Sequence, residues 1–177
     1  MNQIYKIDCY SIYLIIFKKT KMPYQIYDIS KNLITECFQS SKTEFKKWIP
    51  YDDECYHREL NVDNSLIENI YQTTGIKREI DVSSTKVQHT KYEFEKHYEL
   101  MPHQDFCPIT LLVYLHQYGE IKDEFYIEDK LVEEPRWNKK EDSYTALVMN
   151  SPEAEGLEHY GYFEGKGKRE LLVFFLG

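Results

Sequence analysis

The sequence has few residues that interrupt a folded chain and no long apolar run. Its 177 residues include only 7 glycines and 6 prolines, which excludes a collagen-like protein or a flexible linker. No run approaches the roughly 18 apolar residues that a membrane-spanning helix requires. The most apolar early run covers only residues 12–17, and no small-residue cleavage site follows it. We therefore expect neither a signal peptide nor a membrane partner.

Cysteine and positive charge are both scarce. The four cysteines, at positions 9, 37, 55 and 107, show no CxxC pair and no zinc-finger spacing. They are typical of reduced, mostly buried thiols, so we expect a cytoplasmic protein. The 22 Lys and Arg residues against 30 Asp and Glu residues give a net charge of −8. Such a field repels phosphate backbones, which makes nucleic acid an unfavourable partner.

The residues that are present favour one globular domain rich in strands. Hydrophobic residues make up 42% of the chain and charged residues 29%, enough for a real core. Sixteen tyrosines contribute to an aromatic content of 15%, which favours β-structure. We expect a single domain over residues 22–177. Residues 1–21 are either an extension outside the core or a genuine first strand, and the sequence carries no signature of an oligomeric state.

Two helices are expected in the first half of the chain. The apolar spacing predicts one over Lys31 to Ser40, with Asp28 or Ser30 as its N-cap. It predicts a second over Ser65 to Thr74, where Gly75 is a natural stop. A polar, aromatic connection separates the two.

From about residue 79 the pattern changes to the period of two that is typical of strands. Short apolar runs follow one another, and clusters of Gly, Pro, Asn and Asp separate them. These runs are Ile109–Leu115, Phe125–Ile127, Thr145–Met149 and Leu171–Leu176. We therefore expect a mainly β (α+β) protein in which helices come first and an antiparallel β core occupies about residues 79–177.

A histidine and a carboxylate two residues apart form the first element of a candidate metal site. His103 and Asp105 lie at the end of a strand-like stretch, where positions i and i+2 point the same way. Together they supply two ligands of a two-histidine, one-carboxylate facial triad. The third ligand must come from much later in the chain, and His159 is the only histidine after His116.

An arginine follows ten residues after His159. Gly165 and Gly167 lie between them and suit a hairpin turn. If the hairpin loop has an odd number of residues, His159 and Arg169 both face the interior. A buried guanidinium is costly unless it meets an anion, and its rigid fork matches a carboxylate.

This combination resembles the iron(II)/2-oxoglutarate-dependent dioxygenases. The HxD segment within Tyr98–Asp105, the distal His159 and Arg169 ten residues later resemble most the prolyl-4-hydroxylase-like branch. The resemblance covers about residues 88–176. It implies a double-stranded β-helix, or jelly roll, with the N-terminal helices packed on the major sheet.

The resemblance also implies roles for residues. His103, Asp105 and His159 would be the catalytic residues that bind Fe(II). Arg169 would bind the distal carboxylate of the co-substrate 2-oxoglutarate, and the hydroxyl of Tyr92 or Tyr98 would add to that contact. Because most of the sixteen tyrosines must pack in the core, a packing role is the alternative for both.

The implied activity is that of an oxidoreductase, namely a dioxygenase acting as a hydroxylase. O2 would occupy the remaining iron position, and ascorbate is a further candidate cofactor. A carboxylate at Asp105 disfavours halogenation. A peptidyl prolyl residue is the first candidate substrate, and a free amino acid or small metabolite is the next.

Two other classes of protein stay open on the sequence. One is a non-catalytic jelly-roll protein that binds a metal or a partner without turnover. The other is a cupin-like metalloprotein, which would place His57 or His97 near the ion instead of His159.

Two segments without helix or strand periodicity are expected to cover the open end of the barrel. They are Trp48 to His57 and Glu133 to Ser143, and each carries a tryptophan and charges. Tyr51 and Trp137 would then contact the substrate. For Trp137, packing as a loop anchor is the favoured alternative.

Overall fold

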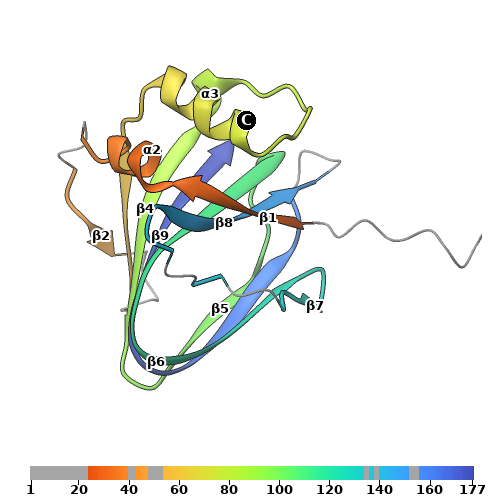
Figure 1. Ribbon diagram of the computed structural model, residues 1–177. Coiled ribbons are helices and arrows are strands. Elements are labelled where there is room, and N and C mark those ends of the chain that lie inside the picture. Colours follow the sequence, from red (N-terminus) through yellow and green to blue (C-terminus); the bar gives the residue numbers. More distant parts are fainter. Residues whose placement is uncertain (1–23, 40–42, 48–53, 134–135, 138–139, 152–155) are drawn as a thin grey trace, which may run out of the picture.

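The computed structural model describes residues 24–39, 43–47, 54–133, 136–137, 140–151 and 156–177 (Figure 1). The expected N-terminal segment of residues 1–21 lies outside these ranges. The chain is mainly β, with antiparallel strands and a few short helices, as expected. No helix within the described ranges is long and apolar enough to cross a membrane.

The described strands form one antiparallel sheet with the order β1-β8-β6-β9-β4-β3-β2. Beside this path, β5 pairs with β9 and β7 pairs with β6. The strands are β1 (Tyr24–Ser30), β2 (Lys46–Lys47), β3 (Cys55–Leu60), β4 (Lys86–Phe94), β5 (His97–His103), β6 (Ile109–Ile127), β7 (Lys130–Leu131), β8 (Ser143–Asn150) and β9 (His159–Leu176).

The two longest strands, β6 and β9, fold the sheet back on itself. They pair with each other from end to end and bend together near the bottom of Figure 1. Beyond the bend, β9 exchanges its partner β4 for β5, and β6 exchanges β8 for β7. The sheet therefore has two halves, and the short half faces one side of the long half.

Glycine makes this bend sterically accessible. Gly119 of β6 lies opposite Gly167 of β9, and a Cβ atom on Gly119 would lie 2.3 Å from the carbonyl oxygen of Lys166. The hairpin expected at Gly165 and Gly167 is wrong, because β9 runs without interruption through both. These glycines allow close strand contact in a bend and do not form a turn. His159 and Arg169 still share the interior face, because ten residues along one strand return a side chain to the same side.

Both expected helices exist, and both are short. α2 (Lys31–Glu36) begins after Ser30, whose side chain accepts a bond from the Asn32 amide. It ends earlier than the expected Ser40, because the amides of the next residues bond three residues back in a tightened turn. α3 (Asn64–Thr73) has Asp63 as its N-cap and ends just before Gly75.

The expected order, with helices before strands, is wrong. β1 precedes α2, and β3 lies between the two helices with Tyr56 and His57 inside it. Neither strand shows strict alternation in its own sequence. β1 is fixed by pairing with β8, and β3 is fixed by pairing with β4. These long-range contacts decide the structure of segments whose local pattern favours loops.

The two faces of the long half have different partners. Alternation along β6 turns Leu111 and Val113 toward the helices and Leu112 and Tyr114 toward the short half. The helices and the short 3-10 turn η1 (Val82–Ser84) lie on the first face (Figure 1). Apolar side chains from both helices, among them Ile34 and Ile70, bury that face. The second face is left to enclose a cavity.

The described cysteines are buried thiols that form no disulfide, as expected. They are Cys37, Cys55 and Cys107. Burial raises the pKa of the Cys37 thiol to about 12 and also raises that of Cys107. The Cys107 sulfur contacts the Ile109 carbonyl and the Thr110 hydroxyl, so it acts as a packed polar atom and not as a reactive thiolate.

Candidate functional site

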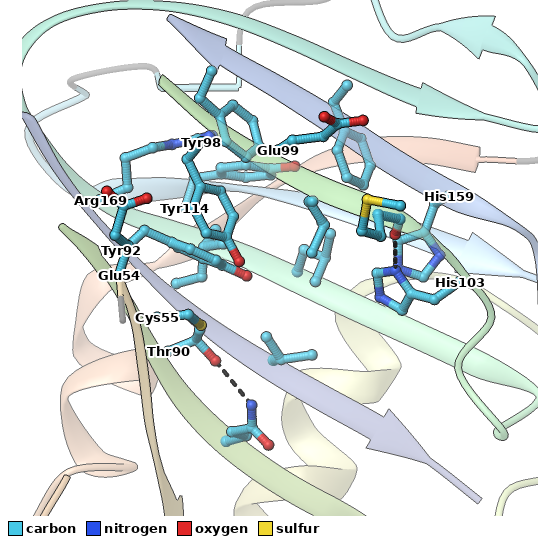
Figure 2. Close-up of a pocket in the computed structure, with 18 of the residues that line it drawn as sticks. Glu54, Cys55, Thr90, Tyr92, Tyr98, Glu99, His103, Tyr114, His159 and Arg169 are labelled. Carbon is cyan, nitrogen blue, oxygen red and sulfur yellow. Dashed lines mark hydrogen bonds between the residues drawn. The ribbon is translucent and has the colours of Figure 1, made fainter. Parts of the chain in front are cut away.

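A cavity of about 730 Å³ lies between the two halves of the sheet (Figure 2). Its walls come from β3, β4, β5, β6 and β9. The lining includes Tyr92, Tyr98, His103, His159 and Arg169, and most of the remaining side chains are apolar. The fold therefore gathers residues that are up to 121 positions apart, from Glu54 to Phe175, around one cavity.

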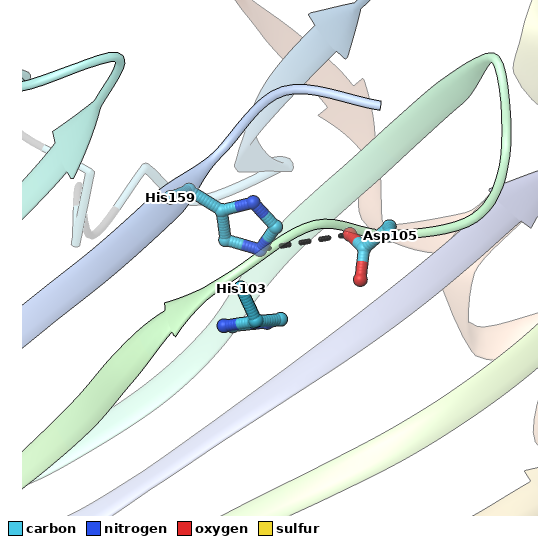
Figure 3. A group of neighbouring side chains, drawn as sticks. All are labelled: His103, Asp105 and His159. Atoms are coloured by element: carbon cyan, nitrogen blue, oxygen red, sulfur yellow. Dashed lines mark ion pairs between the residues drawn. The ribbon is translucent and has the colours of Figure 1, made fainter. Parts of the chain in front are cut away.

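The three expected metal ligands lie together (Figure 3), and two of them, His103 and His159, line one end of this cavity. His103 on β5 is directly opposite His159 on β9, and their ring centroids are 4.2 Å apart. Asp105 follows the end of β5, and its Oδ2 lies 3.6 Å from His159 Nε2. One ligand atom from each residue lies within 4.8 Å of the others, so all three can reach one ion.

Backbone contacts fix the orientation of both imidazoles. His103 Nδ1 lies 2.8 Å from the Met101 carbonyl, and His159 Nδ1 lies 2.9 Å from the Leu157 carbonyl. A carbonyl only accepts, so each Nδ1 carries the hydrogen and each Nε2 keeps its lone pair. Burial lowers the pKa of His159, although Asp105 opposes the shift, which favours the neutral ligand form. The Nε2 lone pair of His159 lies near the Asp105 carboxylate, and a cation between the two would remove their repulsion.

Two residues that the sequence did not single out lie against Asp105, the expected carboxylate ligand. The Thr110 hydroxyl on β6 donates a 2.7 Å hydrogen bond to Asp105 Oδ2. Gly156, at φ +77°, lies so near the Asp105 backbone that a Cβ would be 2.2 Å from its carbonyl oxygen. No pattern in the sequence relates either residue to a metal site, because only the fold brings them to Asp105.

Arg169 lines the cavity away from the two histidines (Figure 2). It is 2% exposed, and it already meets the anion that a buried guanidinium requires. Its Nη2 donates to Asp123 Oδ2 at 3.2 Å, while its Nε has no hydrogen-bond partner in the described part of the chain. Burial lowers the pKa of Arg169 and the Asp123 charge raises it, and an arginine in this setting stays charged at neutral pH. Asp123 was missed because it lies 46 residues before Arg169 and carries no motif.

Three tyrosines line the wall near Arg169. Tyr92 and Tyr98 are buried, with ring centroids 5.1 Å apart, and Tyr98 stacks on Phe163. Both are thus packing residues that also face the cavity. Tyr114 of β6 was not expected there, and burial raises its pKa to about 12, so its hydroxyl keeps its proton.

The other described histidines lie outside the group formed by His103, Asp105 and His159. Among the described residues, neither His57 nor His97 belongs to the group that can reach one ion, against the cupin-like expectation. His57 lies in β3, and His97 lies on the cavity wall at the far end of β5 from His103. His89 is buried against Glu170, and His116 is exposed.

The cavity opens along β5, where its lining residues reach solvent. These exposed residues are His97, Glu99, Met101 and His103. Of the first segment expected at the opening, Glu54 and Cys55 line the cavity, whereas Trp48 and Tyr51 lie outside the described residues.

The second segment expected at the opening is placed differently. Trp137 donates a 2.7 Å hydrogen bond to Asp123 Oδ2. The central carbon of the Arg169 guanidinium lies 4.5 Å from the centroid of the Trp137 ring. It is therefore an anchor behind the cavity wall and not a residue of the opening. A buried indole N–H usually finds an acceptor, and here the Asp123 carboxylate is that acceptor.

Comparisons with known proteins do not place the chain in a family. No protein-family model matches it, and no curated protein matches it in sequence. Among solved structures, the crystal structure of IDO from Bacillus thuringiensis is similar to this chain at 15% sequence identity. The likeness covers 86% of this chain and 92% of that chain, with a TM-score of 0.46.

Proposed function

We propose that this protein is an Fe(II)- and 2-oxoglutarate-dependent oxygenase that acts as a hydroxylase. The observation that carries the proposal is one cavity that is lined by both histidines of a His-Asp-His group and, apart from them, by a buried arginine. We further propose that the folded sheet is a double-stranded β-helix of the prolyl-4-hydroxylase-like kind. Its two short helices would be the layer outside the major sheet.

The donor set fits a non-haem iron. Two imidazole nitrogens and one carboxylate suit Fe(II), and one ligand atom of each lies within 4.8 Å of the others. When bound, Fe(II) would supply O2 activation, with 2-oxoglutarate as the source of electrons. The chain's own part is to fix the ligands: the Met101 and Leu157 carbonyls orient the imidazoles, and Thr110 orients the carboxylate.

The other end of the cavity fits a carboxylate. The Arg169 guanidinium, with an unpartnered Nε, would bind the distal carboxylate of 2-oxoglutarate. The hydroxyls of Tyr92, Tyr98 and Tyr114 line the same space and can donate to that group. Apolar residues such as Leu171 and Val173 line the space between and exclude water, which strengthens both polar contacts.

The substrate would enter along β5, beside the exposed His103. A peptidyl prolyl residue or a small amino-acid-like molecule would present its carbon to the metal from this side. Ascorbate would serve as an auxiliary reductant. The rival function, a non-catalytic metal-binding or interaction protein, shares the cavity and differs in having no turnover.

Turnover without added substrate separates the two functions. We expect the protein, supplied with Fe(II), O2 and 2-oxoglutarate, to release succinate slowly, since many oxygenases of this kind show uncoupled decarboxylation. His159→Ala should abolish the release, and His116→Ala, which changes an exposed histidine outside the metal group, should leave it intact. No succinate from a correctly folded wild-type protein would favour the binding protein.

A further inference from the structure

One buried carboxylate oxygen holds the arginine end of the cavity together. Asp123 Oδ2 accepts from Arg136 Nη2 at 2.6 Å, from Trp137 Nε1 at 2.7 Å and from Arg169 Nη2 at 3.2 Å. The side chains of the two arginines are 3% exposed and that of Asp123 is 11% exposed. Two positive charges and one negative charge are thus buried together, with a net charge of +1.

Aromatic rings surround these charges. The Arg169 guanidinium lies 3.9 Å from the Phe163 ring centroid, and that of Arg136 lies 5.3 Å from the Phe125 ring centroid. In the described part of the chain, neither arginine pairs with a second carboxylate. Water screens charges poorly in such a setting, so one charge more or less changes the free energy of binding strongly.

Only Arg169 of this cluster lines the cavity. Anything that binds there therefore meets one buried guanidinium directly and the other two buried charges from behind it. The carboxylates of Glu54 and Glu99 also line the cavity, but Glu54 is only half-buried and Glu99 is exposed, so solvent screens them more than the buried cluster. A ligand group with one negative charge brings the buried total to zero. A group with two negative charges leaves an uncompensated buried charge, which is costly.

We propose that Asp123 is a specificity-determining residue that sets the anchor at one net positive charge. It makes the site accept a ligand that ends in a carboxylate and reject one that ends in a dianion, such as a phosphonate or a phosphate. The inference rests on the proposed function in one respect, namely that a carboxylate of the ligand binds Arg169. Asp123 selects by charge and does not itself contact the ligand.

The test compares two ligands that differ only at that end. They are 2-oxoglutarate and its analogue in which a phosphonate replaces the distal carboxylate, titrated calorimetrically into the Mn(II)-loaded full chain at a pH where the phosphonate is doubly charged. The wild type should prefer 2-oxoglutarate. Asp123→Asn keeps the shape and raises the buried charge to +2, so the preference should shift toward the phosphonate by on the order of tenfold or more.

A second substitution separates charge from shape. Arg136→Gln alone lowers the buried charge to zero and should weaken 2-oxoglutarate binding, by on the order of tenfold. The double variant Asp123→Asn with Arg136→Gln returns the buried charge to +1, so its preference should return toward that of the wild type. The double variant also keeps the test decisive if Asp123→Asn alone does not fold.

The matched control is Glu124→Gln. It removes the same charge one residue further along β6, where Glu124 pairs with Lys122 on the other face. This variant should keep the wild-type preference. Thermal unfolding of every variant checks that the titrated protein is folded.

Three results would overturn the inference. In the first, Asp123→Asn keeps the wild-type preference. In the second, the double variant behaves like Asp123→Asn. In the third, the wild type binds neither ligand, and this result would also contradict the proposed function. If the wild type binds 2-oxoglutarate but Asp123→Asn keeps the wild-type preference, only the inference about Asp123 is contradicted.

Discussion

At the scale of single residues, the candidate metal site depends on what each ligand contacts behind it. Asp105 receives the Thr110 hydroxyl, and each imidazole is turned by a carbonyl two residues earlier in the chain. Such contacts fix ligand orientation before any ion binds, so an ion does not have to order the side chains. The threonine is the contact that mutation can remove most cleanly.

Thr110→Val should weaken metal binding without removing a ligand. Thr110 is buried and isosteric with valine, so the change removes mainly the 2.7 Å hydrogen bond to Asp105. Loss of such a supporting contact typically costs about 10- to 100-fold in metal affinity. Competition with a chelator measures it. Thr110→Ser keeps the hydroxyl and should retain most of the affinity; equal losses in both variants would mean that packing and not the hydrogen bond matters.

Arg169→Ala should weaken 2-oxoglutarate binding and spare the metal. Breaking a buried charge pair costs about 3–5 kcal/mol, equivalent to more than about a hundredfold in affinity. Arg169→Lys should recover only part, because an ammonium cannot form a two-pronged contact. Calorimetric titrations with Mn(II) and with 2-oxoglutarate give the two affinities separately. If both fell together, Arg169 would be a residue that supports the fold.

The sequence predicted residues that act through spacing and missed those that act through the fold. His103 ends β5 and Asp105 lies two residues further on, while His159 and Arg169 lie on the same face of β9, so spacing along the chain relates the members of each pair. Asp123 reaches Arg169 only because β6 and β9 bend together. No local pattern carries that information.

At the scale of elements, the bend of β6 and β9 is what creates the cavity. The two strands remain paired through it, at Gly119 opposite Gly167 and Ile121 opposite Gly165. The sequence marked the glycines as a turn, because two glycines between strand-like runs usually form one. Close contact between paired strands, which needs glycine for a different reason, has the same local signature.

Gly119→Ala should destabilise the fold far more than Gly75→Ala. Both glycines have positive φ, +91° and +65°, so both variants bear the cost of a left-handed residue, about 1–2 kcal/mol. At Gly75 nothing lies within 4 Å of the new Cβ, whereas at Gly119 a backbone oxygen lies 2.3 Å away. The total at Gly119 should reach on the order of 3 kcal/mol or more. Denaturant unfolding measures both, and equal losses would contradict a tight bend.

The ion pair between β4 and β9 should make stability fall in acid. The hydrogen bond from His89 lowers the pKa of Glu170 from 4.5 to about 2, with burial opposing and Lys91 assisting. A depressed carboxyl pKa stabilises the fold above pH 4.5, and this stability is lost as the pH falls toward 2. The full pKa shift of Glu170 would contribute about 3 kcal/mol to the free energy of unfolding. Water at the partly exposed carboxylate reduces it to on the order of 1 kcal/mol.

Glu170→Gln provides the control for this pH dependence. Unfolding free energies at pH 5 and pH 3 should differ less in the variant than in the wild type. Other carboxyls with lowered pKa, such as Asp63 and Asp81, contribute equally to both proteins and cancel. Identical slopes would show that the pair between β4 and β9 does not stabilise the fold.

At the scale of the whole molecule, the two faces of the sheet separate the helix-covered core from the cavity. The helices bury the face that carries Leu111, Val113 and Phe174, and the cavity occupies the other. Sequence periodicity predicted the mainly β class and both helices, since these are local properties. It did not predict β1, β3 or the folding of one sheet onto itself, since these depend on pairing between distant segments.

The central claim is that one cavity binds a metal through three side chains and 2-oxoglutarate beside it. Anaerobic titration with Fe(II) and then 2-oxoglutarate tests it most directly, since chelation of the iron by the 2-oxo acid gives a visible charge-transfer absorbance. We predict that the absorbance appears only when both are present and that His159→Ala abolishes it. A spectrum equal to the sum of the separate components, or an absorbance that persists in His159→Ala, would contradict the account.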